Sequence, residues 1–145
     1  MTDDLAWVAR GGDGAAPRLI AEIHGTVELE RALAALGEPG HRASDAVEDE
    51  LLGARVVDLE AVVLAEPSTE GRLAAGLARN DEGIQGRYLE APVPLDELAR
   101  RAAAAGVSLS RPGRGPFGRE VLVLGGGIGG PFVVLVEPRS VPSPR

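Results

Sequence analysis

Two stretches of the sequence, 71 residues apart, share one pattern: Val62-Val63-Leu64-Ala65-Glu66-Pro67 and Val133-Val134-Leu135-Val136-Glu137-Pro138. Each is a run of β-branched and aliphatic residues that stops at a Glu-Pro pair. This composition is typical of a buried strand followed by a turn. Because self-similarity at a fixed spacing marks a repeated structural unit, the pattern predicts a chain built from two copies of one supersecondary motif.

A helical pattern that ends in glycine precedes each repeated strand. In residues 28–37 the leucines recur at helical spacing and Gly37 follows them, and residues 95–106 repeat this arrangement with Gly106 at the end. Glycine readily takes the left-handed conformation that ends a helix. Each copy then reads as a strand, a helix and three strands, so the sequence predicts the order βαβββ twice.

The expected elements divide the chain into two modules joined by a helix. The first module, residues 18–67, has strands at 18–25 and 61–66, a helix at 27–36, and extended segments at 41–50 and 53–58. The second module, residues 84–138, has a helix at 95–105 and strands at 85–90, 107–110, 119–124 and 132–137. Residues 68–83 link the modules through a helix at 68–79, which Ser68 is placed to cap. Residues 1–17 are expected to be a mobile N-terminal leader with Trp7 docked on the body, and residues 139–145 a C-terminal tail.

Composition excludes several classes of function. The chain has 145 residues, of which 44% are hydrophobic, enough for the core of one globular domain. It has no cysteine, which excludes disulfides and thiolate metal sites, and its net charge of −7 argues against binding nucleic acid or anionic membranes. No apolar run approaches the roughly 20 residues that cross a bilayer. The acidic start Met1-Thr2-Asp3-Asp4 is unlike a secretory signal, so we expect a cytoplasmic location.

The junction of the modules and the last expected strand carry local motifs. Leu64-Ala65-Glu66-Pro67 is followed by the linking helix and then by Asn80-Asp81-Glu82-Gly83-Ile84-Gln85-Gly86-Arg87-Tyr88, and the final strand begins at Gly130-Pro131-Phe132. With the paired modules, these stretches resemble the vicinal oxygen chelate superfamily, whose members include glyoxalases, bleomycin-resistance proteins and methylmalonyl-CoA epimerases. The resemblance covers roughly residues 18–138. It implies a glyoxalase-like α+β fold in which two pseudo-symmetric βαβββ modules curl their sheets around a cup.

The resemblance also implies where a metal ion would bind. Metal-dependent members place ligands on the first strand of each module and on the last, and those positions fall here on Ala21, Val63, Gly86 and Val134. None of these side chains has a donor atom, so we expect no metal and no cofactor. An alternative stays open, because a one-residue shift in register would turn Glu66 and Glu137 into the cup.

Strand alternation predicts which side chains line the cup. The expected ligand-binding residues are Ala21, Ile23, Val63, Gly86, Tyr88, Phe132 and Val134. Tyr88 is either a packed core residue or a hydroxyl aimed at a ligand carbonyl. Glu22 and His24 stand two residues apart on one strand and form either a general-base pair or a solvated strand face. Glu90 is a further candidate base or a carboxylate at a strand end.

Two loop motifs complete the candidates. Residues 125–130 satisfy G-x-G-x-x-G, but Pro131 and a strand follow instead of a helix, so a dinucleotide site is not expected and a lid over the cup is the remaining interpretation. Arg111, Arg114 and Arg119 form a basic cluster, which is either solvated surface or a contact for an anion such as a phosphate.

Three functions follow, in order of preference. The first is a metal-free binding protein that holds a small, largely apolar organic molecule for sequestration, resistance or transport. The second is a metal-free isomerase, cyclase or lyase that uses Glu22, His24, Tyr88 or Glu90 for proton transfer next to a carbonyl. The third is a metal-dependent epimerase. The expected partner is a small molecule, and the resemblance makes a homodimer plausible.

Overall fold

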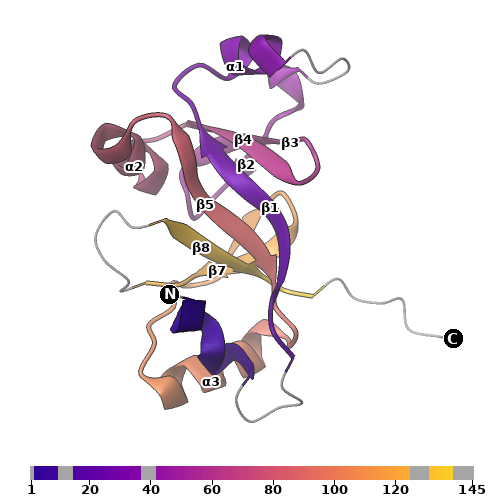
Figure 1. Ribbon diagram of the computed structural model, residues 1–145, viewed down its shortest axis with the longest axis vertical. Helices are drawn as coiled ribbons and strands as arrows, with labels where there is room; N and C mark the ends of the chain where they lie inside the picture. Colours follow the sequence, from indigo (N-terminus) through magenta and orange to yellow (C-terminus); the bar gives the residue numbers. More distant parts are fainter. Residues whose placement is uncertain (1, 10–14, 37–41, 125–130, 139–145) are drawn as a thin grey trace, which may run out of the picture.

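The computed structural model describes residues 2–9, 15–36, 42–124 and 131–138 (Figure 1). The first module contains β1 (Arg18–Gly25), α1 (Leu29–Leu36), the 3-10 helix η2 (Ala43–Asp45), β2 (Val47–Asp49), β3 (Ala54–Asp58) and β4 (Val62–Pro67). After α2 (Arg72–Asn80), the second module contains β5 (Gly83–Glu90), α3 (Leu95–Ala105), β6 (Gly113–Gly115), β7 (Gly118–Leu122) and β8 (Phe132–Val136). Both modules therefore have the predicted order βαβββ.

The eight strands form one sheet in the order β2-β3-β4-β1-β5-β8-β7-β6. The order is pseudo-symmetric, because β1 pairs in parallel with β4, β5 pairs in parallel with β8, and β1 and β5 run antiparallel at the centre. The two edge strands meet, since Glu50 N donates to the carbonyl of Arg114 at 2.9 Å and Arg114 N donates to Glu50 Oε1 at 3.0 Å. The sheet is therefore a nearly closed cup, which confirms the predicted α+β, glyoxalase-like class.

The helices pack through aliphatic faces that their spacing predicts. Leu29 and Leu33 of α1 pack with Val57 and Leu64 on the outside of the first module. Leu95, Leu98 and Ala102 of α3 are buried in a cluster on the outside of the second module. Gly106 ends α3 in the left-handed conformation, as predicted, with φ of 74°. The interior of the cup is filled by a third cluster, described below.

Three local expectations differ from the structure. The strand that follows α3 forms at Gly113–Gly115 and not at 107–110, where Leu109 forms an isolated bridge with Val123. Ser68 does not cap α2, which begins at Arg72 after Gly71. Instead, the Ser68 hydroxyl donates to Glu48 Oε2 at 2.5 Å. Thr2–Ala9, expected within a mobile leader, form the 3-10 helix η1. Its Trp7, whose docking on the body was expected, and Val8 are buried against the α3 cluster, and Arg101 Nη1 donates to the Val8 carbonyl oxygen.

Among the described residues, no helix is long and apolar enough to cross a bilayer. The glycine-rich stretch 125–130, the expected tail 139–145 and Gly37 lie outside the described residues.

Candidate functional site

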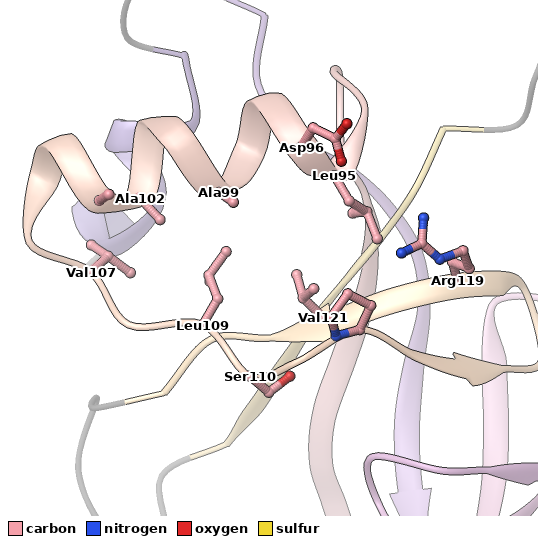
Figure 2. A pocket seen from close by; sticks show the side chains of 11 residues that line it. Leu95, Asp96, Ala99, Ala102, Val107, Leu109, Ser110, Arg119 and Val121 are labelled. Atoms are coloured by element: carbon pink, nitrogen blue, oxygen red, sulfur yellow. The ribbon is translucent and has the colours of Figure 1, made fainter.

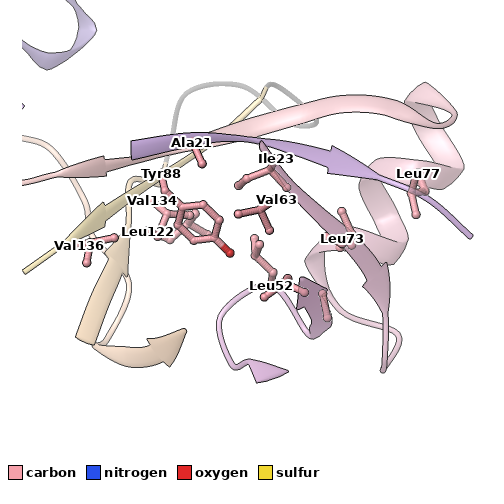
Figure 3. Packing of buried hydrophobic residues seen from close by; sticks show 13 residues of the cluster. Ala21, Ile23, Leu52, Val63, Leu73, Leu77, Tyr88, Leu122, Val134 and Val136 are labelled. Atoms are coloured by element: carbon pink, nitrogen blue, oxygen red, sulfur yellow. The ribbon is translucent and has the colours of Figure 1, made fainter. Parts of the chain in front are cut away.

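Most of the predicted lining residues converge on the concave face of the sheet (Figure 3). The register explains this, because Ile23 is paired with Val63, Ala21 with Tyr88, and Tyr88 with Val134. These five side chains are at most 1% exposed and belong to one cluster. The cluster also contains Leu52, Ala54, Val56, Ala65, Leu73, Leu77, Leu122 and Val136, with Phe132 packed against it. The concave face is thus occupied by packed side chains from both modules.

The residues at the superfamily's metal positions do not fit a metal ion. Ala21, Val63 and Val134 present only methyl groups to the cup. At Gly86 a Cβ atom would lie 2.2 Å from the carbonyl oxygen and 2.7 Å from the nitrogen of Phe132, so the paired backbone leaves no room for a ligating side chain. No group of three or more His, Asp or Glu in the described part of the chain is arranged to hold a metal.

Three polar side chains are buried among these apolar residues. Tyr88, Asp49 and Glu120 are each 0% exposed, and they come from β5, β2 and β7. The Tyr88 hydroxyl donates to Asp49 Oδ2 at 2.6 Å, and Leu52 N donates to Asp49 Oδ1 at 3.0 Å. Both oxygens of the Asp49 carboxylate are therefore hydrogen-bonded. We call Asp49, Tyr88 and Glu120 the acid cluster.

Glu120 lies beside Asp49 without a hydrogen-bond donor of its own. Neither Glu120 oxygen accepts a hydrogen bond within the described structure. A Cβ atom at Gly115 would lie 2.2 Å from Glu120 Oε1 and 2.7 Å from Asp49 Oδ2, so the two carboxyl groups flank the same glycine. The missing side chain at Gly115 is what makes room for them. Two adjacent buried carboxyl groups are most stable when one holds a proton and donates it to the other.

The two carboxyl groups are equally buried, but two donors reach Asp49 and none reaches Glu120, so the proton is favoured on Glu120. Burial, the neighbouring Asp49 and the charge of Glu50 together raise the pKa of Glu120 to about 10. Burial and the neighbouring Asp49 also keep the pKa of Tyr88 well above its usual range. At neutral pH the acid cluster therefore contains a protonated Glu120 and a Tyr88 phenol that donates to Asp49. A strongly shifted acid beside a second acid is a common feature of catalytic sites.

Aromatic and aliphatic side chains enclose the acid cluster. The Phe117 ring packs edge-on against Tyr88, with centroids 5.1 Å apart and planes at 75°. Leu51, which precedes the turn residue Leu52, and Phe117, which lies between β6 and β7, pack against the core cluster. A molecule that reaches the two carboxyls must displace these side chains or separate β2 from β6.

The other predicted catalytic residues lie away from the acid cluster. Glu22 and His24 alternate with the buried Ala21 and Ile23 and so point to the convex face. There, His24 Nε2 lies 3.4 Å from Glu22 Oε1, and both side chains are partly exposed. Glu90 forms an ion pair with Arg18 at the far ends of β5 and β1. The structure therefore places Glu22 next to His24, and it places Tyr88 with neither of them.

Sequence reasoning missed Asp49 and Glu120, although one signal was present. Glu120 alternates with Leu122 inside the strand expected at 119–124, so it shares a strand face with an aliphatic residue. Asp49 lies in a three-residue strand without apolar alternation. No local pattern in the sequence indicates that its side chain is buried.

A separate groove runs along α3 on the outside of the second module (Figure 2). It has a volume of about 320 Å³, and α3, the segment 107–112 and β7 form its walls. Leu95, Ala99, Ala102, Val107, Leu109 and Val121 supply its apolar surface. Arg119 and Asp96 lie at one end.

The curled eight-stranded sheet and the paired βαβββ modules define a protein of the glyoxalase fold. No protein-family model and no curated relative matches the sequence. Among solved structures, methylmalonyl-CoA epimerase from Mycobacterium tuberculosis is 23% identical, with 84% of this chain and 89% of that chain covered and a TM-score of 0.66. A Streptomyces coelicolor methylmalonyl-CoA epimerase variant in complex with 2-nitronate-propionyl-CoA is 22% identical over 88% of this chain and 98% of that chain, with a TM-score of 0.67.

A methylmalonyl-CoA epimerase in complex with methylmalonyl-CoA and NH4+ is 22% identical, with 90% of this chain and all of that chain covered and a TM-score of 0.68. These likenesses confirm the glyoxalase-like fold that the sequence predicts. At such identities the likeness extends to the fold alone, so the chemistry has to be argued from the residues of this chain.

Proposed function

We propose that this protein binds a small organic carbonyl compound inside its cup and moves a proton next to the carbonyl without a metal ion. The observation that carries the proposal is the buried pair of carboxyl groups, Asp49 and Glu120, on the concave face. A carboxylate and a carboxylic acid held side by side in a low-dielectric site are the two partners that general acid–base catalysis requires.

The acid cluster can take up and supply each proton that the reaction moves. Ionised Asp49 removes the proton from the carbon next to the carbonyl, and the Tyr88 hydroxyl turns from Asp49, whose charge is lost as it takes that proton, to donate a hydrogen bond to the developing enolate oxygen. Protonated Glu120 returns a proton to the carbon, which leaves Asp49 protonated and Glu120 ionised. A proton then passes from Asp49 to Glu120 and restores the starting state. The net change is exchange of the proton on that carbon, with inversion of the carbon where Glu120 delivers its proton to the opposite face, and the cycle needs no oxidant or other reactant.

Acyl thioesters with a substituent at carbon 2 are the first substrate class to test. The solved structures of the same fold hold methylmalonyl-CoA and 2-nitronate-propionyl-CoA, both acyl-CoA compounds. The aliphatic lining from Ala21, Val63 and Val134 suits a small acyl group. A second candidate function is sequestration of such a molecule without turnover, which the same aliphatic lining favours.

The test is exchange of the carbon-2 proton in D2O. Methylmalonyl-CoA and propionyl-CoA are incubated with the EDTA-treated protein, and loss of the proton signal is followed by NMR. We expect exchange with the wild type, and a loss of about 100-fold or more in Glu120→Gln and in Asp49→Asn, the usual contribution of a general acid or base. Glu70→Gln, at an exposed position outside the cup, is the matched control and should exchange at the wild-type rate.

The results of this exchange experiment distinguish the proposed proton transfer from sequestration, from catalysis by another site and from metal-dependent catalysis. Binding without exchange in the wild type would favour sequestration over the proposed reaction. If exchange is lost in Glu22→Gln and kept in Glu120→Gln, the convex-face pair of Glu22 and His24 is the catalytic site and the proposal is wrong. Exchange that vanishes in EDTA and returns with a divalent metal would equally contradict it.

A further inference from the structure

The internal repeat offers a comparison between two equivalent arginines. Arg55 on β3 and Arg119 on β7 each form an ion pair with a glutamate at the end of the next strand, Glu66 or Glu137. On the other side, Arg55 is paired across the sheet with Glu48 of β2. Arg119 is paired in the same way with Arg114 of β6. One carboxylate of the first module is thus replaced by a guanidinium in the second.

This replacement places two arginines directly opposite each other on the convex face of the second module, with Glu137 beside Arg119 and the Glu50 carboxylate at the backbone of Arg114. Like charges directly opposite each other on neighbouring strands destabilise the sheet unless a counter-charge is present. The remaining pair is also looser: Arg119 Nη1 lies 3.5 Å from Glu137 Oε1, whereas Arg55 Nε donates to Glu66 Oε1 at 3.1 Å and a second guanidinium nitrogen contacts the same oxygen. The chain has a net charge of −7, so two arginines opposite each other form a locally basic site in an acidic protein.

Of these two arginines, Arg119 lines the α3 groove (Figure 2). Arg119 lies at its polar end, and the rest of its surface is aliphatic. The space exists because α3 presents Ala99, Ala102 and Ala103 to it, where larger side chains would fill it. Its volume of about 320 Å³ lies within the range of small-molecule sites. The groove is on the opposite face of the sheet from the acid cluster.

We infer that the α3 groove binds an aliphatic carboxylate, whose chain lies along α3 and whose carboxylate lies between Arg114 and Arg119. In the first module, Glu48 supplies a carboxylate at the equivalent position, so the ligand replaces the acid that the second module lacks. Guanidinium and carboxylate groups match as bidentate hydrogen-bonding partners. Glu137 and Asp96 border the site and repel a dianionic phosphate more strongly than a singly charged carboxylate.

Calorimetric titration with octanoate tests the inference, with octanol, octyl phosphate and inorganic phosphate as comparison probes. We expect octanoate to bind at least 10-fold more tightly than octanol or octyl phosphate, and its affinity to fall as salt is added. Arg114→Glu, which reproduces the charge of the first module, should weaken octanoate binding at least 10-fold, and Arg114→Gln should weaken it less. Ala99→Leu should weaken it by filling the groove.

Arg55→Gln is the matched control in the first module and should leave octanoate affinity unchanged, and thermal melts establish that each variant is folded. Equal binding of octanol, tighter binding of octyl phosphate, or undiminished binding in folded Arg114→Glu would each overturn the inference. So would the absence of any heat of binding with octanoate at millimolar concentration. Because Glu120→Gln should bind octanoate normally, the inference and the proposed function can fail separately.

Discussion

Among single residues, Glu120 links the stability of the fold to pH. Its carboxyl group is buried beside Asp49, and burial and that neighbour raise its pKa far above the value in an unfolded chain. Between those two pKa values the folded protein holds a proton that the unfolded chain has released. Stability is therefore greatest below the unfolded pKa and falls as the pH rises toward the folded pKa.

Glu120→Gln should remove this pH dependence. Glutamine keeps the shape and can donate to Asp49, but it does not titrate. From pH 5.5 to pH 8.5 the free energy of unfolding of the wild type should decrease relative to that of the variant, by at most about 1.4 kcal/mol per pH unit. Urea unfolding at several pH values measures this difference. Glu70→Gln, at an exposed position, serves as the control, and parallel pH profiles for the wild type and Glu120→Gln would show that Glu120 is not protonated in the folded state.

The same residues show why the site was predictable only in part. Tyr88 could be placed on the concave face from the alternation of β5, and it lies there. Its partner Asp49 is 39 residues away and reaches Tyr88 only because the sheet curls. Pairing across a curled sheet depends on the register of strands that are distant in sequence, and a single-sequence pattern does not contain that information.

Among the helices and strands, the sequence predicted those whose own residues show apolar alternation or helical spacing. The predicted bounds of β1 and α3 agree with the structure, because apolar alternation defines the strand and leucine spacing with Gly106 defines the helix. The three-residue β6 was not predicted. Its sequence, Gly113-Arg114-Gly115, has low strand propensity, and β6 forms because β7 offers it a partner and β2 closes over it.

The close pairing of β5 with β8 requires a residue without a side chain at position 86. A Cβ atom there would overlap the backbone of Phe132, which cannot rotate away as a side chain can. We expect Gly86→Ala to reduce the free energy of unfolding by about 2 kcal/mol or more, within the range of overpacked core substitutions. Urea unfolding provides the measurement.

Gly106→Ala is an informative comparison for Gly86→Ala. Gly106 has open space around its Cβ position but a positive φ of 74°, so alanine there should cost about 1 kcal/mol through backbone strain alone. If Gly86→Ala costs no more than Gly106→Ala, the close approach of β5 to Phe132 is not what excludes side chains from position 86. A ligating side chain at that position would then become possible.

At the scale of the whole molecule, the two modules enclose a cup that is filled and nearly closed. The core cluster combines side chains from both modules, so neither module completes the core alone. The sequence predicted the repeat and the cup. It did not predict that Leu51, Leu52 and Phe117 close over the acid cluster, because these residues lie in turns, where neither alternation nor helical spacing indicates the direction of a side chain.

Access to the acid cluster then depends on the contact between the two edge strands. Arg114 N donates to the Glu50 side chain, and Glu50 N donates to the Arg114 carbonyl, next to the buried Asp49. Glu50→Ala removes the acceptor of the first bond and leaves the second. We expect the Arg114 amide to exchange with solvent deuterium roughly 5- to 10-fold faster, as loss of about 1 kcal/mol of hydrogen bonding predicts, with little change in β1 and β5.

Residue-resolved hydrogen exchange by NMR distinguishes local opening from general loss of stability. Glu48→Ala, two residues away on the convex face, removes a carboxylate that accepts from Ser68 and should leave the Arg114 amide unchanged. Faster exchange throughout β1 and β5 in Glu50→Ala would mean that the edge contact stabilises the whole fold and does not gate the cup. Faster exchange confined to β6 and the neighbouring turn would show that the cup opens at this edge, where the two carboxyl groups lie closest to the outside. A substrate that reaches Asp49 and Glu120 would then enter between β2 and β6, and Glu50→Ala should lower its KM while leaving kcat unchanged.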